Sequence, residues 1–230
     1  MAGNTKRDMG TGSVKKLMAQ MAVPALVGQV INLLYNIVDR IYIGHLPEIG
    51  GDALTGVGLF TPILMLITAF AMLAGAGGAP RAAIAMGQGN QKKAEQILGN
   101  CFSVLMILAV ILTGVFYFTC PMLLRWFGAS DVTLPYAVEY ARIYILGSVF
   151  VLTTMGMNVF ITTQGFAKIS MITVLIGALL NIVLDPLFIF VFDMGVSGAA
   201  LATIISQGVS ALWVLKFLFG KKTTIKLRKK

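Results

Sequence analysis

The sequence predicts an all-α membrane protein, a bundle of six transmembrane helices. Its composition is the first reason: 57% of the residues are hydrophobic, 12% are charged and the mean hydropathy is +0.87, which the surface of a soluble 230-residue domain could not accommodate. The second reason is that six apolar runs can cross about 30 Å of hydrocarbon at about 1.5 Å per residue. Within these runs, for example from residue 104 to 118, no period of two appears, which disfavours a β-barrel.

The six runs follow one another with short loops between them. The predicted helices cover residues 17–43, 53–79, 97–119, 136–160, 169–192 and 197–219. The first run is too long for a signal peptide, contains Gln29, Asn32 and Asn36, and lacks a small-residue cleavage site, so we expect a retained helix. Residues 1–16 are expected to form a cytoplasmic amino-terminal segment, and residues 221–230 a basic cytoplasmic tail.

Lysine and arginine gather on one side of the predicted bundle. They precede the first helix, occupy the loops after the second and fourth helices, and fill the tail: Lys6, Arg7, Lys15, Lys16, Arg81, Lys92, Lys93, Lys168, Lys221, Lys222, Lys226, Arg228, Lys229 and Lys230. Because cytoplasmic loops retain these residues, we expect both termini in the cytoplasm and the bundle in the cell membrane, in contact with lipid. The net charge of +9 then reflects membrane topology, and no nucleic-acid partner is expected.

Motifs of enzymes find little support. The single histidine, His45, has no Cys, Asp or His at metal-ligand spacing, and the glycines of 75–78 and 87–89 neither follow a strand nor precede a Lys-Ser/Thr pair. We therefore expect a protein that is not an enzyme and needs no cofactor.

Polar residues inside the predicted helices follow helical spacing. Members of each stripe lie three or four residues apart, or a multiple of four, and so share one helix face. The stripes are Gln29, Asn32, Asn36 and Asp39 in the first helix, Thr154 and Asn158 in the fourth, Thr173, Asn181 and Asp185 in the fifth, and Thr203, Gln207 and Ser210 in the sixth. In lipid, such faces turn toward one another or toward a water-filled cavity. Interhelical hydrogen bonds of about 0.6 kcal/mol each are one explanation; a substrate cavity, to which Tyr35 would also belong, is the other.

The carboxylates of Asp39 and Asp185 need a further explanation, because a charge at the centre of a membrane helix costs roughly 2.5–3.5 kcal/mol on insertion scales. With the amino terminus inside, Asp39, Asp185 and Thr203 lie roughly 7, 12 and 9 Å below the outer surface, at about 1.5 Å per residue. Asn181 lies one turn deeper than Asp185. Carboxylate and neutral oxygens suit hard cations, so these four residues predict a cation site. Pairing of Asp39 with Arg40 is a weaker explanation, because adjacent residues point to different sides of a helix.

Several segments together resemble the multidrug and toxic compound extrusion (MATE) family over residues 17–220. They are MAVP at 21–24, NIVDRIYIG at 36–44, ALTGVG at 53–58 followed by TP at 61–62, GQGN at 87–90 with Ala94, NIVLDP at 181–186 and GVSGAALAT at 195–203. No single segment is specific, whereas their order and spacing together are.

The resemblance implies a sodium or proton site whose ligands are Asp39, Asn181, Asp185 and Thr203, the same set that the depth argument assembles. It also implies that Pro24 marks a bend in the first helix that responds to the bound ion. A static kink is the alternative, because proline removes one backbone hydrogen bond in either case.

The function implied by the resemblance is cation-coupled antiport by alternating access, with amphipathic organic cations as substrates. Two carboxylates in one site repel each other and titrate as a pair, and an entering sodium ion or proton relieves that repulsion. Family members have two six-helix bundles, so the chain is expected to be the amino-terminal half, with a second bundle, from its own copy or another chain, as partner.

Two alternatives remain. One is a lipid-linked saccharide flippase of a related family, for which the basic residues of the outer half, Arg40, Arg125 and Arg142, are few. The other is a truncated half without independent transport.

Overall fold

The structure, a computed structural model, describes residues 13–227, and every regular element in this range is a helix. The helices are α1 (Val14–Gly44), α2 (Gly50–Leu59), α3 (Thr61–Gly87), α4 (Gln91–Trp126), α5 (Leu134–Leu146), α6 (Ser148–Thr163), α7 (Ala167–Pro186), the π-helix η1 (Leu187–Val191) and α8 (Gly195–Phe219). The prediction of an all-α membrane bundle is confirmed. The predictions for residues 1–12 and 228–230 lie outside the described residues.

The helices extend beyond the predicted apolar runs, because helical hydrogen bonding continues into polar turns that hydropathy does not detect. α4, for example, begins at Gln91 rather than at residue 97. The preceding residue, Asn90, caps this helix start, because its side chain accepts a 3.1 Å hydrogen bond from the Lys93 amide. Within the described residues, five continuous stretches can cross a membrane by length and hydropathy, and the bent pair α5–α6 makes a sixth.

Two spans that the sequence predicts as single helices are irregular: one is interrupted at a single residue, and the other is bent. Phe60 separates α2 from α3, which starts with Pro62 in its first turn, where a missing backbone N–H is tolerated. Gly147 separates α5 from α6, and the two helices meet at 56°. A Cβ atom at Gly147 would overlap the side chain of Ile204 in α8, so the bend brings α8 against the bare backbone of this residue.

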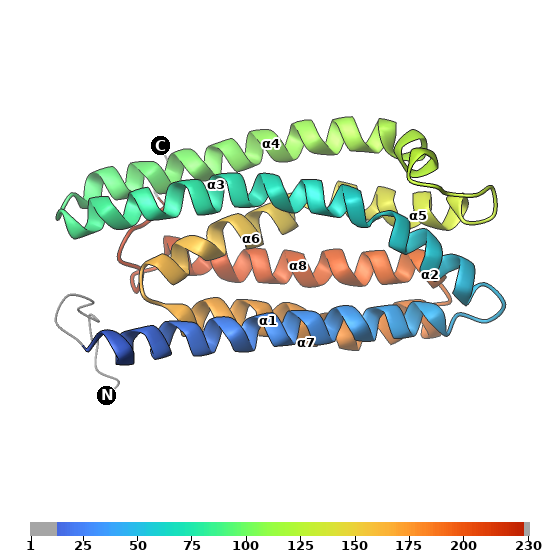
Figure 1. Cartoon of the computed structure of the whole chain (residues 1–230), viewed down its shortest axis with the longest axis horizontal. Coiled ribbons are helices and arrows are strands. Elements are labelled where there is room, and N and C mark those ends of the chain that lie inside the picture. The colour runs from blue at the N-terminus through green and yellow to red at the C-terminus, as the bar shows by residue number, and fades with distance from the viewer. Residues whose placement is uncertain (1–12, 228–230) are drawn as a thin grey trace.

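The helices form three layers (Figure 1). α1 packs along α7 on one side, α3 packs along α4 on the other, and α6 and α8 lie between these pairs. α1 begins and α8 ends at the same end of the bundle. This arrangement places α1, α7 and α8 side by side, which brings their polar stripes together.

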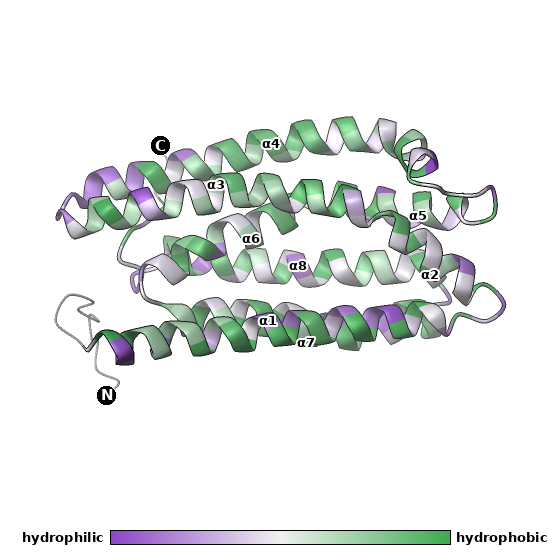
Figure 2. Ribbon diagram, viewed as in Figure 1, coloured by the Kyte–Doolittle hydropathy of each residue, from purple (hydrophilic) through white to green (hydrophobic). Residues whose placement is uncertain are grey.

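Small side chains occupy much of the bundle interior beside large apolar ones such as Phe60 and Phe160, and many other large apolar side chains face outward. α3 buries Ala71, Ala74, Gly75, Gly78 and Ala79 among others, which lets neighbouring helices approach closely. On the outside, Val110 is 75% exposed and Phe118 is 82% exposed. The apolar colouring of α4 and of the outer side of α1 in Figure 2 agrees with contact with lipid.

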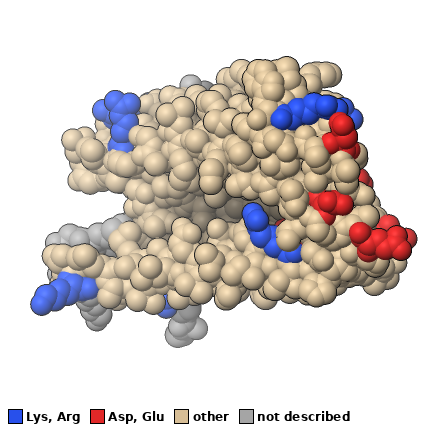
Figure 3. All heavy atoms as spheres, turned by 45° about the vertical axis from the view of Figure 1, so that its right-hand side comes forward, with Lys and Arg blue, Asp and Glu red and all other residues tan. Residues whose placement is uncertain are grey.

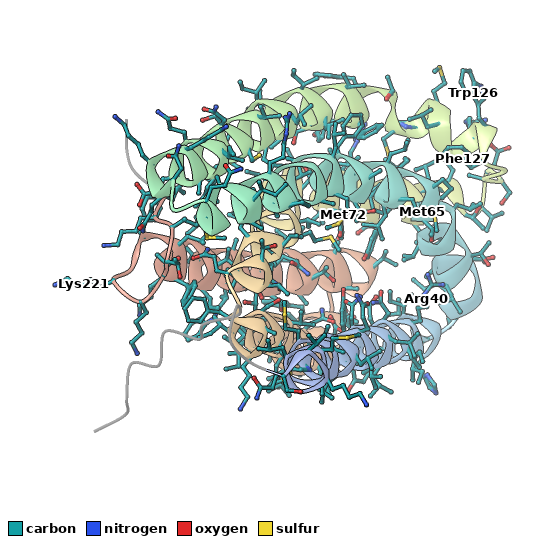
Figure 4. All side chains as sticks on the ribbon, turned by 60° about the vertical axis from the view of Figure 1, so that its left-hand side comes forward. Arg40, Met65, Met72, Trp126, Phe127 and Lys221 are labelled. Atoms are coloured by element: carbon teal, nitrogen blue, oxygen red, sulfur yellow. The ribbon has the colours of Figure 1, made fainter. Side chains whose placement is uncertain are left out.

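The segment after α8 packs against the end of the bundle and is not a free tail. Ile225 and Leu227 are buried, and Gln164 after α6 accepts hydrogen bonds from the Thr223 hydroxyl at 2.7 Å and from the Thr224 and Ile225 amides at 2.8 and 3.0 Å. Gln91 and Glu95 of α4 bond the same segment through the Thr224 carbonyl and the Lys226 amide. Lys221 projects away from the bundle (Figure 4).

Candidate cation site

Two neighbouring helices assemble three of the four predicted ligands. Asn181 and Asp185 lie one turn apart on α7, and the Asn181 amide donates to Asp185 Oδ1 at 2.9 Å. The same amide group is 3.4 Å from Thr203 Oγ1 of α8, which itself donates to the Ala199 carbonyl at 3.0 Å. All three side chains are buried. The packing of α7 against α8 therefore joins them into one hydrogen-bonded cluster.

The fourth predicted ligand, Asp39, comes from α1. Its side chain is buried and lies beside Asp185, so the two carboxyl groups interact. No ion pair joins Asp39 to Arg40 among the described residues, and Arg40 is exposed. Figure 4 shows Arg40 projecting from α1 toward α3. The structure thus brings all four predicted residues to one place and keeps the adjacent guanidinium outside it.

Three oxygens of this cluster have no hydrogen-bond partner among the residues that the structure describes. They are Asp39 Oδ1, Asn181 Oδ1 and Asp185 Oδ2, each of them buried. Oxygen-only ligands of this kind suit a hard cation such as sodium, or a proton on the carboxylates. Among the described residues no group of three or more His, Cys, Asp or Glu side chains is placed to hold a metal ion, so a transition-metal site finds no support there.

One tyrosine next to the cluster, Tyr140, was missed by the sequence analysis. Tyr140 is buried, its hydroxyl interacts with Thr203, and it lies near Asp39. Its ring stacks on Tyr144 and meets Phe60 edge-on. Tyr35 of α1, predicted as a cavity residue, also lies near both aspartates. Aromatic spacing in an apolar helix resembles packing, so the sequence offers no signal that Tyr140 contacts a polar cluster.

A cavity of about 350 Å³ begins at Asn181 and Thr203 of the cluster and runs between α1, α6, α7 and α8. Most residues predicted for a cavity or polar network line it, together with Pro24: Gln29, Asn32, Tyr35, Thr154, Asn158, Asn181, Thr203 and Gln207. Asn36 is not among the lining residues, and its amide donates to the Asn32 carbonyl of its own helix at 2.7 Å. Met72 of α3 lines its edge, and Figure 3 shows the surface hollowed between the α1 layer and the α3 layer.

Interhelical hydrogen bonds also run through the cavity wall. Thr154 donates to the Gln207 carbonyl at 3.2 Å, Asn158 to the Ser170 carbonyl at 3.3 Å, and Ser210 to the Thr173 carbonyl at 3.2 Å. The two explanations of the polar stripes, helix association and a polar cavity, therefore hold together. Ser206, which the sequence analysis did not select, lines the cavity and is buried without a protein partner.

These features define a class of protein: a multi-pass membrane bundle with a buried cluster of two carboxylates, an amide and a hydroxyl. The sequence model of the MatE family matches residues 24–187, and the chain belongs to this family. It is 30% identical over 215 residues to the multidrug export protein MepA of Staphylococcus saprophyticus, a match that covers 93% of this chain and 47% of that protein.

Solved structures of MATE proteins agree with the fold. Crystal structures described as MATE in the bent and in the straight conformation match with TM-scores of 0.87 and 0.86 at 31% identity. Each match covers 94% of this chain and 48% of the other. The chain thus spans about half the length of the relatives that it matches.

Proposed function

We propose that this chain forms the cation-binding bundle of an antiporter that exports amphipathic organic cations, and that Asp39, Asn181, Asp185 and Thr203 hold the coupling sodium ion or proton. The observation that carries the proposal is the set of three buried, unpartnered oxygens in one cluster, Asp39 Oδ1, Asn181 Oδ1 and Asp185 Oδ2. Buried acceptors without a donor are costly, and a cation or a proton between the two carboxyl groups would remove that cost.

Export of drugs is proposed from the relatives. The S. saprophyticus protein is described as a multidrug export protein, and this chain matches about half of it. We propose that substrate binds between this bundle and a second six-helix bundle, from another copy or another chain. The cavity described above has no Lys or Arg among its lining residues, which weighs against recognition of a pyrophosphate by a flippase.

We further propose that Pro24 is a hinge. It lies inside α1, lines the cavity and is on the helix that carries Asp39. Matching MATE structures have been described in bent and straight conformations. Because proline cannot donate the helical hydrogen bond at its position, α1 is weakest there, and a cation at Asp39 would favour one shape of the helix by its differential affinity.

The orientation that we propose places both termini of the described bundle in the cytoplasm of a cell-membrane protein. Acidic side chains gather at the end of the bundle opposite to the start of α1 (Figure 3). Glu48, Asp52, Asp131, Glu139 and Asp193 lie in or beside the loops of that end. The basic residues of the other end, such as Arg81 and Lys168, follow the rule that cytoplasmic loops retain positive charge.

The experiment that tests the cation site is a fluorescence titration of the purified chain with sodium, at constant ionic strength and at several pH values. The Trp126→Phe background leaves Trp213 of α8 as the single reporter. We expect a saturable response to sodium, which Asp39→Asn and Asp185→Asn each abolish. We also expect protons to compete with sodium. Asp193→Asn is the matched control, because Asp193 is exposed and its φ of 53° is one that Asn also adopts.

An unchanged sodium response in Asp185→Asn would overturn the proposed site. The oligomeric mass in detergent, recorded in parallel, separates a self-paired bundle from a single one. Export is tested by ethidium efflux from cells that lack their own efflux pumps, where Asp185→Asn is expected to transport no faster than empty vector.

A further inference from the structure

The cavity is elongated along the bundle. On α7 its lining residues extend from Ser170 to Asn181, and on α1 from Pro24 to Tyr35. Each stretch corresponds to about 16 Å at about 1.5 Å per residue. Ser170 lies in the first turn of α7, at the same end of the bundle as Gln164 and the buried segment after α8. One end of the cavity therefore meets Asn181 and Thr203 of the ligand cluster, where Asn181 bonds Asp185 behind the wall, and the other nears the end of the bundle that carries the basic loops.

The cavity wall is largely apolar in area but includes polar groups on α1, α6, α7 and α8, and it carries no charged side chain among its described lining residues. Four polar atoms of lining residues are buried without a protein partner: Asn158 Oδ1, Asn181 Oδ1, Ser206 Oγ and Gln207 Oε1. Asn181 and Ser206 are 1% and 2% exposed.

The direction of two of these amides is determined by their own hydrogen bonds. The nitrogen of Asn158 donates to the Ser170 carbonyl and that of Asn181 to the Asp185 carboxylate, so neither group can be reversed without losing a bond. Their oxygens are thereby left as acceptors without a donor. Neutral acceptors of this type interact with water, and with the cations that water carries.

The volume suits water. A cavity of about 350 Å³ holds roughly ten water molecules at about 30 Å³ each, and buried unpaired polar groups such as these four are usually bridged by water. Neutral polar groups in the wall let a cation enter without binding it too tightly to leave, which conduction requires.

We propose that this cavity is a water-filled passage inside the bundle, through which the coupling sodium ion or proton moves between the Asp39–Asp185 cluster and the cytoplasmic end of α7. This inference rests on the proposed cation site and deepens it. It assigns to Ser206, Asn158 and Gln207 the role of solvating the moving ion rather than binding substrate.

The passage is tested by the reaction of single cysteines with a membrane-impermeant cationic methanethiosulfonate, in a background with Cys101→Ala and Cys120→Ala. Reagent is applied to the cytoplasmic side of sealed inside-out vesicles, and the extent of reaction is read by mass. Because the thiolate forms where water reaches the sulfur, Ser206→Cys and Thr173→Cys are expected to react at least about tenfold faster than Leu212→Cys, a 66% exposed residue of α8 that faces lipid.

A bulky side chain placed inside the cavity tests whether the reagent reaches Ser206→Cys through it. A Cβ at Gly28 would meet only Val174 Cγ2 at 3.9 Å, so Gly28→Leu places its bulk in the cavity, between Ser170 and Ser206. It is expected to slow the reaction of Ser206→Cys at least about tenfold. Gly114→Leu, which adds the same bulk in open space on α4, is expected to leave that reaction unchanged.

No faster reaction at Ser206→Cys and Thr173→Cys than at Leu212→Cys would overturn the passage. Reaction only from the outer side, or reaction that Gly28→Leu does not slow, would overturn the cytoplasmic route. The sodium titration does not depend on either result, so a working cation site without a passage is recognised as such.

Discussion

The side-chain amide of Asn181 donates a 2.9 Å hydrogen bond to Oδ1 of Asp185, one turn further along α7. This bond orients both groups: the nitrogen is occupied, and the oxygens Asn181 Oδ1 and Asp185 Oδ2 remain without protein donors. Asn181 is therefore expected to act both as a ligand and as the residue that holds Asp185 in place.

Asn181→Ala is expected to weaken sodium binding about 10–100-fold, because it removes an oxygen and frees the Asp185 carboxylate to move. The fluorescence titration measures this loss. Asn36→Ala is the comparison, and a smaller loss is expected, since the Asn36 amide donates to the carbonyl of Asn32 within its own helix and its side chain reaches only Tyr35 at the edge of the cluster. Equal losses in the two variants would contradict a specific role for Asn181.

Tyr140→Phe is expected to weaken cation binding several-fold without lowering the melting temperature. The hydroxyl that interacts with Thr203 is lost, but the ring contacts with Phe60 and Tyr144 remain. Tyr144→Phe serves as the comparison, and a smaller effect is expected there. A Tyr140→Phe protein with native affinity would show that the tyrosine only packs.

Gln164→Leu is expected to loosen the segment after α8. It leaves two donors, the Thr224 and Ile225 amides, without their acceptor, while the Thr223 hydroxyl keeps the Ile225 carbonyl as its acceptor. The expected loss of stability is about 1–3 kcal/mol, visible as a lower melting temperature in detergent and faster tryptic cleavage after Lys222 and Lys226. Gln88→Leu, an exposed glutamine at the end of α3, should change neither.

Gly147→Ala is expected to destabilise the bundle by about 1–3 kcal/mol, the usual range for overpacking. The new Cβ overlaps Ile204, so the penalty should largely vanish in an Ile204→Ala background, as a double-mutant cycle would measure. Gly77→Ala, whose Cβ meets nothing within 4 Å, is expected to be neutral or slightly stabilising. An additive cycle would argue against the clash.

The proposed orientation predicts which loops an impermeant thiol reagent reaches from outside intact cells. With Cys101 and Cys120 replaced by alanine, Asp52→Cys in α2 should react and Gln88→Cys after α3 should not. In inside-out vesicles the pattern should reverse. Labelling of Gln88→Cys from outside would invert the topology that the basic loops indicate.

The fold class and the ligand cluster could be predicted from the sequence because both depend on simple periodicities. Apolar runs of sufficient length predict spans, and a spacing of four residues places Asn181 and Asp185 on one face of α7. Depth along each helix then brings Asp39 and Thr203 to a similar level. The contact of Asp39 with Asp185 follows from those rules once α1 packs against α7.

Other features depend on tertiary contacts that a sequence does not display. The 56° bend at Gly147 arises where α8 meets α5 and α6, and the apolar run 136–160 gives no hint of it. From the sequence, Tyr140 is predicted only to pack against other apolar side chains, because its neighbour Thr203 lies on a different helix. The segment from Lys221 onward reads as a basic linker, because only its alternate residues, Thr223, Ile225 and Leu227, are buried.

The bonds of Gln164 also set an order of events during biogenesis. Gln164 and Thr223 are 59 residues apart in the chain, and Glu95 and Lys226 are 131 apart. At roughly 5–20 residues synthesised per second, about 3–12 s pass between the appearance of Gln164 and that of Thr223. During that interval the loop after α6 lacks these donors, and it acquires them only when α8 has been made and inserted. Closure of this contact thus marks the moment at which the six-span bundle is complete.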